Sequence, residues 1–260
     1  MRIIDTKIIE ENVRTLCMEV NRELPTDIYN FILSLSISDI IDNCAAAKEL
    51  NLPLCQDTGM AVVFIKIGQD VHLEGKSFYK AINDGVARGY KEGYMRMSIV
   101  KDPLNRINTN TNTPAIIHTE ITDGDKIELT VCAKGFGSEN MSELKMLLPT
   151  ISREDIINEV VKTVKKAGDN ACPPMIIGIG IGGDFEYCTY LAKKALCRSF
   201  DFKHENDYYN SLENDILTAI NAKKNMAMKV CIEYYPTHIA GLPLAVNIGC
   251  HVNRHKTVVI

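Results

Sequence analysis

Nine cysteines are the residues of this 260-residue chain that most directly suggest chemistry. Their number is odd, no Cys-x-x-Cys pair occurs, and the charged N-terminal residues do not suit an export signal. A disulfide framework, a zinc ribbon and a thioredoxin-type redox site are therefore poor interpretations. Reduced cysteine is otherwise a small hydrophobic side chain that fills protein cores, and this interpretation suits most of the nine.

Three cysteines differ from the rest because each lies in a loop beside the end of an expected helix or strand: Cys55, Cys172 and Cys250. Three such loops could converge and hold an iron–sulfur cluster. Four thiolates close a cluster that transfers electrons, whereas three leave one iron with an open position, which can act as a Lewis acid on a substrate oxygen. Pro173 and Pro174 fit this role for Cys172, since they remove amide donors and stiffen the chain. Spacing alone nevertheless favours the core-filling interpretation.

Three further patterns each allow a functional and a structural interpretation. The glycine-rich stretch 178–183, GIGIGG, follows an expected strand and opens a helix, so it could bind a nucleotide or allow close strand–helix packing, which we favour. His251 and His255 could share a metal ion, but a solvated tail is the simpler interpretation. His238 is either hydrogen-bonded in a turn or a carboxylate binder or proton carrier.

Charge and hydropathy argue against two classes of function. The chain has 29 basic and 33 acidic side chains, a net charge of −4 and no basic stripe, so nucleic-acid binding is not expected. No apolar run approaches the roughly 18–20 residues that cross a bilayer, so no membrane span is expected. The composition predicts a globular protein, and we expect it to be cytoplasmic.

Hydrophobic periodicity predicts the elements that must position the loops in the first half of the chain. A buried strand is expected over 60–67, directly after the Cys55 loop. Residues 115–122 and 126–133 are expected to form a hairpin around Asp123-Gly124-Asp125, because Asp-Gly supplies the turn. Ser38 is the expected cap of one helix. Polar loops are expected over 98–114 and 135–142. Helices are expected over about residues 8–24, 28–36, 38–50 and 77–92.

The second half alternates between helices and strands. Ser152 and Asp155 resemble a capping box that opens a helix ending near Ala167. The further elements are strands at 175–181, 227–235 and 242–248 and helices at 184–198 and 205–223. This order predicts an α/β fold with mixed β-sheets surrounded by helices. The length suits one large domain or two close-packed lobes, and we expect one large domain over residues 1–260.

Taken together, the loops resemble those of the class I, iron–sulfur-dependent fumarate hydratases and the similar L(+)-tartrate dehydratases. Any one of the matching segments is weak evidence for the family, but six segments in the order in which the family has them are highly specific. Met60 and Phe136 depart from the family pattern without removing a chemical group. The matching segments are Leu54–Gly59, Arg96–Val100 with Asp102–Leu104, Asn108–Pro114, Lys134–Asn140, Cys172–Pro174 with Gly178–Gly183, and His238–Pro243 with Cys250.

The resemblance implies a site as well as a fold. It implies that Cys55, Cys172 and Cys250 hold a [4Fe-4S] cluster, and that a C4 dicarboxylate is bound by Gln56, Arg96, Gly137 and His238. Asp57, beside the cysteine, is the candidate for acid–base catalysis; its alternative role is to orient a ligand or neighbouring cation, with the base on a partner. Asn110 and Asn112 either bind substrate or cap the loop backbone.

The length implies a subunit of a larger enzyme. Single-chain family members carry a further C-terminal domain, so the chain looks like the α subunit, an N-terminal-type catalytic domain, of a two-subunit form. The implied partners are a β subunit and a second α subunit, as a homodimer or an α2β2 assembly. Fumarate is favoured over tartrate as substrate. A nucleotide-binding oxidoreductase and an inactive assembly subunit are the alternatives.

Overall fold

The computed structural model describes residues 1–260, which form two compact units. Unit 1 comprises residues 1–134 and 254–260, and unit 2 comprises residues 135–253. Each unit has a mixed sheet and its own hydrophobic core, so the predicted α/β fold with mixed sheets and helices is confirmed. One large domain over 1–260 stays a prediction. No helix has the length and apolar character needed to cross a membrane.

The main sheet of unit 1 has the strand order β10-β5-β2-β4. Strand β2, the first of this sheet along the chain, pairs parallel with β4 and antiparallel with β5, and β10 pairs antiparallel with β5. A separate parallel pair is formed by β1 and β3. The strands are β1 (Arg2–Asp5), β2 (Met60–Gly68), β3 (Val71–Glu74), β4 (Ile116–Thr122), β5 (Ile127–Lys134) and β10 (His255–Val259).

The predicted hairpin of residues 115–133 is wrong, although both of its strands and its turn are present. Gly124 has φ +94°, as an Asp-Gly turn requires, but β2 lies between β4 and β5. The turn wraps around the end of β2, and the Gly68 amide donates to the Lys126 carbonyl at 2.8 Å. The reason is that β2 is buried along most of its length, so it takes the central position and hydrogen-bonds on both edges.

Four helices belong to unit 1: α1 (Thr6–Arg22), α2 (Thr26–Ser34), α3 (Ser38–Leu50) and α4 (Phe78–Glu92). All four were expected from periodicity. Ser38 does not cap α3, however: it is the first helical residue, and the capping position is taken by Ile37, which has no side-chain oxygen.

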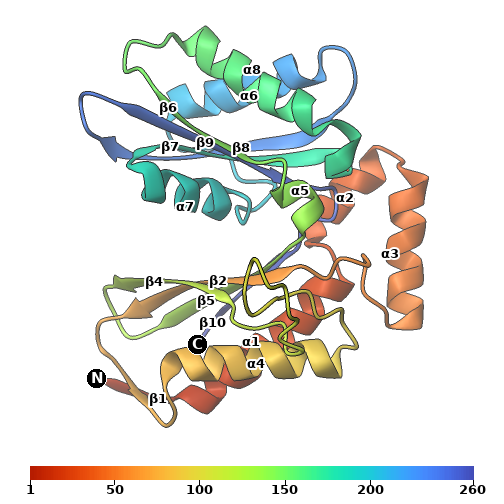
Figure 1. The fold of residues 1–260 in the computed structure, drawn as a ribbon, viewed down its shortest axis with the longest axis vertical. Coiled ribbons are helices and arrows are strands. Elements are labelled where there is room, and N and C mark those ends of the chain that lie inside the picture. Colours follow the sequence, from red (N-terminus) through yellow and green to blue (C-terminus); the bar gives the residue numbers. More distant parts are fainter. The chain divides into compact units, whose positions relative to one another are not determined.

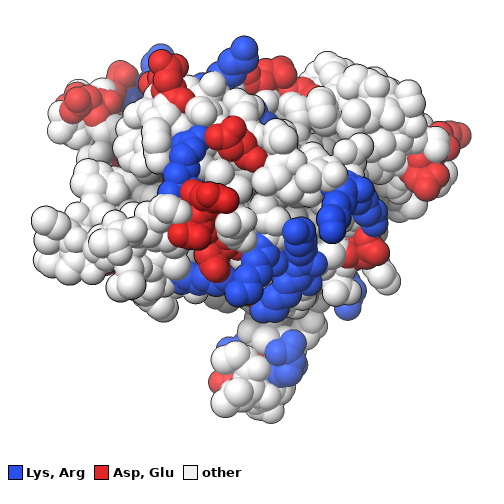
Figure 2. Space-filling model, turned by 90° about the horizontal axis from the view of Figure 1, so that it is seen from above, with Lys and Arg blue, Asp and Glu red and all other residues white.

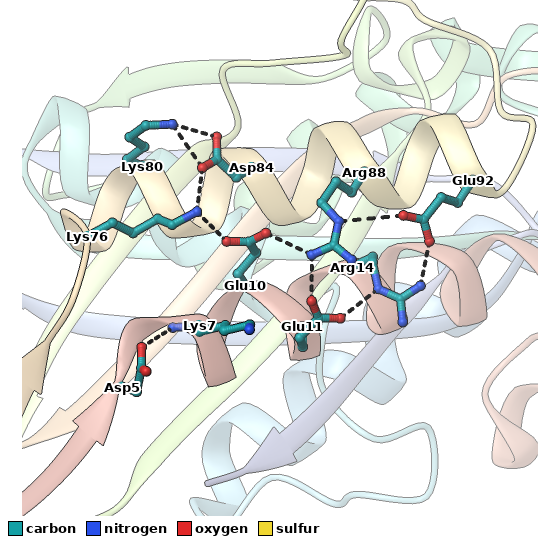
Figure 3. A network of polar contacts seen from close by, with 10 residues as sticks. All are labelled: Asp5, Lys7, Glu10, Glu11, Arg14, Lys76, Lys80, Asp84, Arg88 and Glu92. Carbon is teal, nitrogen blue, oxygen red and sulfur yellow. Dashed lines mark hydrogen bonds and ion pairs between the residues drawn. The ribbon is translucent and has the colours of Figure 1, made fainter.

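The helices α1 and α4 approach closely because α4 carries glycine where they meet. A Cβ at Gly85 would lie 2.6 Å from the Glu10 carbonyl oxygen, and one at Gly89 would lie 2.7 Å from that of Arg14. Along the same contact, charged side chains of both helices and Lys76, which lies just before α4, form a continuous ion-pair network (Figure 3). Lys76 and Arg88 lower the pKa of the nearly buried Glu10 carboxyl by hydrogen bonding.

The sheet of unit 2 has the order β6-β9-β7-β8, with β7 parallel to β8 and antiparallel to β9. The helices α6 and α8 cover one face and α7 the other (Figure 1). Its strands are β6 (Glu143–Leu147), β7 (Met175–Gly183), β8 (Ala227–Thr237) and β9 (Leu242–Gly249); its helices are α5 (Phe136–Glu139), α6 (Arg153–Ala167), the 3-10 turn η1 (Gly168–Ala171), α7 (Phe185–Ala195) and α8 (Asp207–Asn221).

Local details of unit 2 confirm two sequence-based interpretations and correct one. Ser152 caps α6, since its hydroxyl accepts from the Asp155 amide at 3.0 Å. Gly178 and Gly180 allow close strand–helix packing. A Cβ at Gly178 would lie 2.2 Å from a carbonyl oxygen of α7, and one at Gly180 would lie 2.0 Å from another. The expected loop over 135–142 contains the short helix α5.

The expected solvated tail after residue 250 is also wrong. His255 begins β10, and its Nε2 is buried without a hydrogen bond, although part of the residue reaches the surface. Burial lowers the pKa of His255 to about 4. The preceding Arg254 is only 2% exposed. The pairing of β10 with β5 explains why this polar stretch is ordered, because it satisfies the backbone of an otherwise open sheet edge.

Candidate active site

The backbone of the Cys55 loop, residues 51–59, is anchored before Cys55. The Leu54 amide donates to the Asn21 carbonyl at 2.8 Å. The Leu54 carbonyl accepts from the Asn43 side chain at 2.9 Å. Leu54 itself is buried, whereas Cys55 is half-buried. The loop therefore leaves the core immediately before the cysteine.

The same loop is anchored again after Cys55. The Tyr90 hydroxyl lies within hydrogen-bond distance of the Thr58 carbonyl, at 2.8 Å, and of the Gly59 carbonyl, at 3.0 Å. Tyr90 is fully buried. Between the two sets of anchors, Cys55 and the exposed Gln56 are left out of these hydrogen bonds. The sequence thus fixes the loop backbone while keeping these two side chains available for a ligand.

Arg254 also holds this loop, and the sequence did not point to it. Its guanidinium donates to the Asp57 carbonyl at 2.8 Å and to the Asn21 side-chain oxygen at 3.0 Å. Arg254 is among the largest fully buried side chains of the chain, and the two oxygens to which it donates are neutral. A buried cation of this kind favours negative charge in its surroundings. The only available signal was its position beside Cys250, in a tail that was expected to be solvated.

Asp57 shapes the end of the loop with its own side chain. One of its carboxylate oxygens accepts from the Gly59 amide at 2.9 Å, which closes a turn around Thr58. Gly59 has φ +76°, and a Cβ there would lie 2.9 Å from the backbone of Lys134. The glycine is therefore required, and the Asp57 carboxylate is fixed at one oxygen. Its expected acid–base role stays a prediction.

Arg96 is tied to the Cys55 loop through its backbone. Its carbonyl accepts from the Thr58 hydroxyl at 3.0 Å, and its side chain is exposed. Asn112 is fully buried: its side chain accepts from the Ser98 amide at 2.7 Å and donates to the Gly59 carbonyl at 3.1 Å. Asn112 therefore caps backbone, one of its two expected roles. The guanidinium of Arg96 extends from an anchored segment and suits a carboxylate ligand.

In unit 2 the structure brings the Cys172 and Cys250 loops together. Cys172 follows η1 and precedes β7, and Cys250 follows β9, which runs antiparallel to β7. The Cys172 carbonyl accepts from the backbone amide of His251 at 3.1 Å, and the His251 Nδ1 lies 2.9 Å from the same oxygen. Cys172 is exposed and Cys250 half-buried. Two of the three predicted cluster ligands thus lie at one end of this sheet.

Gly137 lies at the same end. A Cβ at Gly137 would approach nothing closer than the Asn170 carbonyl in η1, at 3.8 Å. The loop that carries Gly137 is joined to the end of β9, where the Ile248 amide donates to the Ser142 hydroxyl at 3.1 Å. The packing of unit 2 does not require glycine at 137, which leaves its surface open to a ligand.

A buried polar group that the sequence interpretation missed holds this loop. Asn247 in β9 is buried and donates to the Glu139 carboxylate and the Ser142 hydroxyl, both at 3.1 Å. The other Glu139 oxygen forms an ion pair with Lys193 of α7. An asparagine inside the apolar run 242–249 was the available signal, since buried polar side chains are normally hydrogen-bonded.

His238 does not lie with Cys172 and Cys250. It follows β8 in the connection to β9, where its Nδ1 accepts from the Ala240 amide at 3.2 Å. The preceding Thr237 pairs with Gly183 at the C-terminal end of β7, whereas Gly249 pairs with Ile176 near the other end. The β8–β9 connection and α5 lie at opposite ends of the sheet (Figure 1). His238 is therefore separated from the paired cysteines by the length of β7.

Four of the six remaining cysteines are buried and fit the core-filling interpretation, whereas Cys44 and Cys197 are half-buried. Burial raises the pKa of Cys17 and Cys231 to about 12 and that of Cys188 to about 11, and it also raises the pKa of Cys44. Cys132 is buried in β5. None of the nine cysteines is assigned to a disulfide, and no three His, Cys, Asp or Glu side chains are grouped to hold a metal ion. The face drawn in Figure 2 shows interspersed charges of both signs.

Comparison with known proteins adds a family to this geometry. A family model described as fumarate hydratase (Fumerase) matches residues 10–259. A Methanocaldococcus jannaschii protein provisionally named L(+)-tartrate dehydratase subunit alpha is 38% identical over 234 residues, covering 84% of this chain and 82% of that protein. The L(+)-tartrate dehydratase subunit alpha of Escherichia coli K12 is 26% identical over 276 residues, covering 97% of this chain and 90% of that protein. The protein of the same name from Shigella sonnei shows the same identity and coverage.

Proposed function

The chain belongs to the fumarate hydratase (Fumerase) family of hydro-lyases, and on this premise we propose that it is the α subunit of an enzyme that reversibly hydrates fumarate to malate. The observation that carries the proposal is the family match along nearly the whole chain. The reaction adds hydroxyl to one carbon of the double bond and a proton to its neighbour, and such an activity belongs to the tricarboxylic acid cycle.

The proposed cofactor is a [4Fe-4S] cluster held by Cys55, Cys172 and Cys250. The donor set fits this group: these three thiols are partly or fully accessible and lie in loops, and two of those loops are joined through His251. Most of the other cysteines are buried in helices and strands. With three thiolates, such a cluster supplies a Lewis acid for the oxygen that is added to or removed from the substrate.

The side chains of this chain would bind and orient the diacid. Arg96, exposed on an anchored backbone, suits two parallel hydrogen bonds to one carboxylate. Gln56 and Gly137 offer an amide side chain and an open backbone surface to the same ligand. His238 is the fourth proposed substrate-binding residue.

Asp57 is the proposed acid–base residue. One of its oxygens accepts from the Gly59 amide, which fixes the orientation of the carboxylate that would transfer the proton. In the direction of malate formation it would supply a proton to carbon, and in the reverse direction it would remove one. The alternative is that Asp57 only orients the loop and that the base lies on a partner.

A β subunit is the proposed partner, because the relatives are named as alpha subunits. The β subunit would supply further groups for substrate binding and catalysis. A dimer of α subunits, alone or within an α2β2 assembly, is part of the proposal.

L(+)-tartrate dehydration is the second candidate function. The observation that favours it is the name of the relatives, which are L(+)-tartrate dehydratase alpha subunits. Both reactions add water to a C4 dicarboxylate or eliminate water from one, so the same residues would serve either reaction. The two substrates differ in a second hydroxyl group, which malate lacks and which is not the one that tartrate loses as water. Recognition of that group would therefore decide between the two activities.

One assay tests both candidates. The chain is co-expressed with the β-type subunit encoded by the same organism, purified without oxygen, and supplied with fumarate, malate and L(+)-tartrate in parallel. Fumarate hydration with a kcat/KM above that for tartrate dehydration supports the proposal. Preference for tartrate supports the second candidate, and inactivity on all three substrates refutes both.

A further inference from the structure

We propose that Arg254 is a positioning residue of the active site, and that its buried positive charge is the counter-charge of the cluster that the Cys55 loop helps to hold. This role rests on the proposed function, because it needs that cluster. It goes beyond anchoring the loop, since it requires the charge of Arg254 and not only its hydrogen bonds. All the residues that support it belong to unit 1.

Arg254 carries a full positive charge inside unit 1. The residue is 2% exposed, and its Nε is buried without a hydrogen-bond partner. Arginine stays protonated in proteins, so the cost of burial cannot be relieved by loss of a proton. The backbone is held as well, because the Ala133 amide of β5 donates to the Arg254 carbonyl at 3.1 Å. The guanidinium is therefore charged, fixed in place and poorly solvated.

No acidic side chain neutralises this charge. Arg254 forms no ion pair, and its two acceptors are the Asp57 backbone carbonyl and the side-chain oxygen of Asn21. Asn21 is fully buried, and its side-chain nitrogen donates to the Cys17 carbonyl at 3.0 Å, which turns the oxygen towards Arg254. An aspartate would have the same shape at position 21, but the chain has a neutral amide there.

The C-terminal end of α1 offsets part of the charge. Asn21 lies in the last turn of this helix, where the free carbonyl groups amount to roughly half a negative charge. A substantial part of the Arg254 charge thus has no counterpart in the chain itself. Buried charges normally have a partner, because their desolvation is costly. The missing partner, together with the unpaired Nε, points to a negative group that the chain binds.

The Cys55 loop brings this charge close to the proposed cluster. A carbonyl oxygen lies about 2.4 Å from its own Cα, and two residues of chain span at most about 7 Å. With the 2.8 Å hydrogen bond to Asp57, the Arg254 guanidinium therefore lies within about 12 Å of the Cys55 Cα. A cluster with thiolate ligands carries net negative charge, and the charges and hydrogen bonds around it set its reduction potential.

A dissolved diacid is a less suitable counter-charge. At 2% exposure, Arg254 cannot touch a ligand that enters from solvent, whereas the side chain of Arg96 is exposed and can. Two of the Arg254 nitrogens are also occupied by Asp57 and Asn21. Arg254 would therefore act through the Cys55 loop and through its charge, without contact with substrate.

The charge of Arg254 should favour the more reduced, more negative form of the cluster. Two unit charges about 12 Å apart, at an effective dielectric constant of about 20, attract strongly enough to change an equilibrium roughly 10-fold. Removing the charge should therefore make one-electron reduction roughly 10-fold less favourable, which is a shift of about 59 mV to more negative potential.

The midpoint potential of the cluster tests this role. The chain is co-expressed with the β-type subunit and reconstituted without oxygen, and the reduced cluster is measured by EPR during a reductive titration. Arg254→Gln removes the charge but keeps a neutral amide donor, and its potential should be lower by the roughly 10-fold equivalent given above. Arg254→Lys keeps the charge, and its potential should stay close to that of wild type.

Two variants are controls for this titration. Tyr90→Phe removes another buried anchor of the same loop, but one without charge. Lys256→Gln removes a positive charge that is 51% exposed and two residues from Arg254. Both should keep the wild-type potential. Asn21→Asp cancels the charge in a second way, by placing a carboxylate beside Arg254, and should lower the potential in the same direction. It replaces Arg254→Gln if that variant does not fold.

Two results would overturn the counter-charge role. One is a wild-type potential in both Arg254→Gln and Asn21→Asp. The other is an equal shift in Arg254→Gln and Arg254→Lys, which would show that hydrogen-bond geometry matters and charge does not. In both cases a wild-type complex with iron and hydratase activity leaves the proposed function intact. A wild-type complex with neither iron nor activity would instead refute the proposed function, and the role of Arg254 with it.

Discussion

Replacing Arg254 by methionine should destabilise unit 1, because this buried side chain supports the Cys55 loop. Arg254 is 2% exposed, and its guanidinium donates to the Asp57 carbonyl at 2.8 Å and to Asn21 at 3.0 Å. Methionine has a similar length and fills much of the same space without either donor. The substitution therefore tests the polar contacts rather than the packing.

The expected magnitude follows from two opposing contributions. Each hydrogen bond from a charged donor stabilises by roughly 1.5–3 kcal/mol, and the variant loses two. Removing a buried charge also removes its cost of desolvation, which offsets part of this loss. We expect the free energy of unfolding to fall by about 2–4 kcal/mol for Arg254→Met. Arg254→Lys keeps the charge but not the forked guanidinium with its several donors. Its free energy of unfolding is expected to lie between those of wild type and Arg254→Met.

Urea unfolding followed by circular dichroism measures this change, with an unchanged slope showing that the folded state stays compact. If the two units unfold separately, the shift belongs to the transition of unit 1. Lys256→Met is the matched control, because Lys256 is two residues away and forms only an exposed ion pair with Glu19, worth less than about 1 kcal/mol. A change below about 0.5 kcal/mol for Arg254→Met would refute the anchoring role.

The remaining predictions concern pH, packing and substrate binding. His255→Leu should remove a pH dependence of stability: burial lowers the pKa of His255 to about 4, so the unfolded chain binds a proton first and stability falls as the pH drops from about 6.5 towards 4, by at most about 3 kcal/mol. Denaturant unfolding of both proteins across this range checks it, and parallel curves would contradict it. Gly178→Ala should destabilise by more than about 2 kcal/mol, because its Cβ would lie 2.2 Å from a backbone oxygen of α7, whereas Gly241→Ala, with nothing within 4 Å, should unfold like wild type. Gly137→Ala should keep wild-type stability but raise the KM for fumarate, since the nearest atom lies at 3.8 Å; an unchanged KM would argue against a role for Gly137 in substrate binding.

Periodicity predicted most elements of this fold because long helices and buried strands leave strong local patterns. The short strands β1, β3, β6 and β10 were missed, since four or five residues carry little pattern. The hairpin was wrongly predicted for a different reason. Asp-Gly correctly indicated a tight turn, but local sequence does not show that a third strand, β2, hydrogen-bonds between the two arms.

The features of the candidate site also divide into those that local sequence shows and those that it does not. The cysteine types, the loops and the family order were visible in the sequence, whereas contacts between distant residues were not. Arg254 is 197 residues from Asp57, so no local pattern could link them. The separation of His238 from Cys250 is likewise a property of strand order: twelve residues apart in sequence, they lie at opposite ends of one sheet.

The central claim is that three particular thiolates hold a cluster that makes this chain a hydro-lyase subunit. Its most direct test is the iron and sulfide content of the complex, reconstituted without oxygen, for Cys55→Ser, Cys172→Ser and Cys250→Ser beside Cys44→Ser and Cys197→Ser. Cys44 and Cys197 are matched controls, because they are also partly accessible but are not among the proposed ligands. We predict that each of the first three variants loses the cluster and hydratase activity while both controls keep them. The account would be contradicted if any one of the Cys55→Ser, Cys172→Ser and Cys250→Ser complexes kept its full iron content and activity.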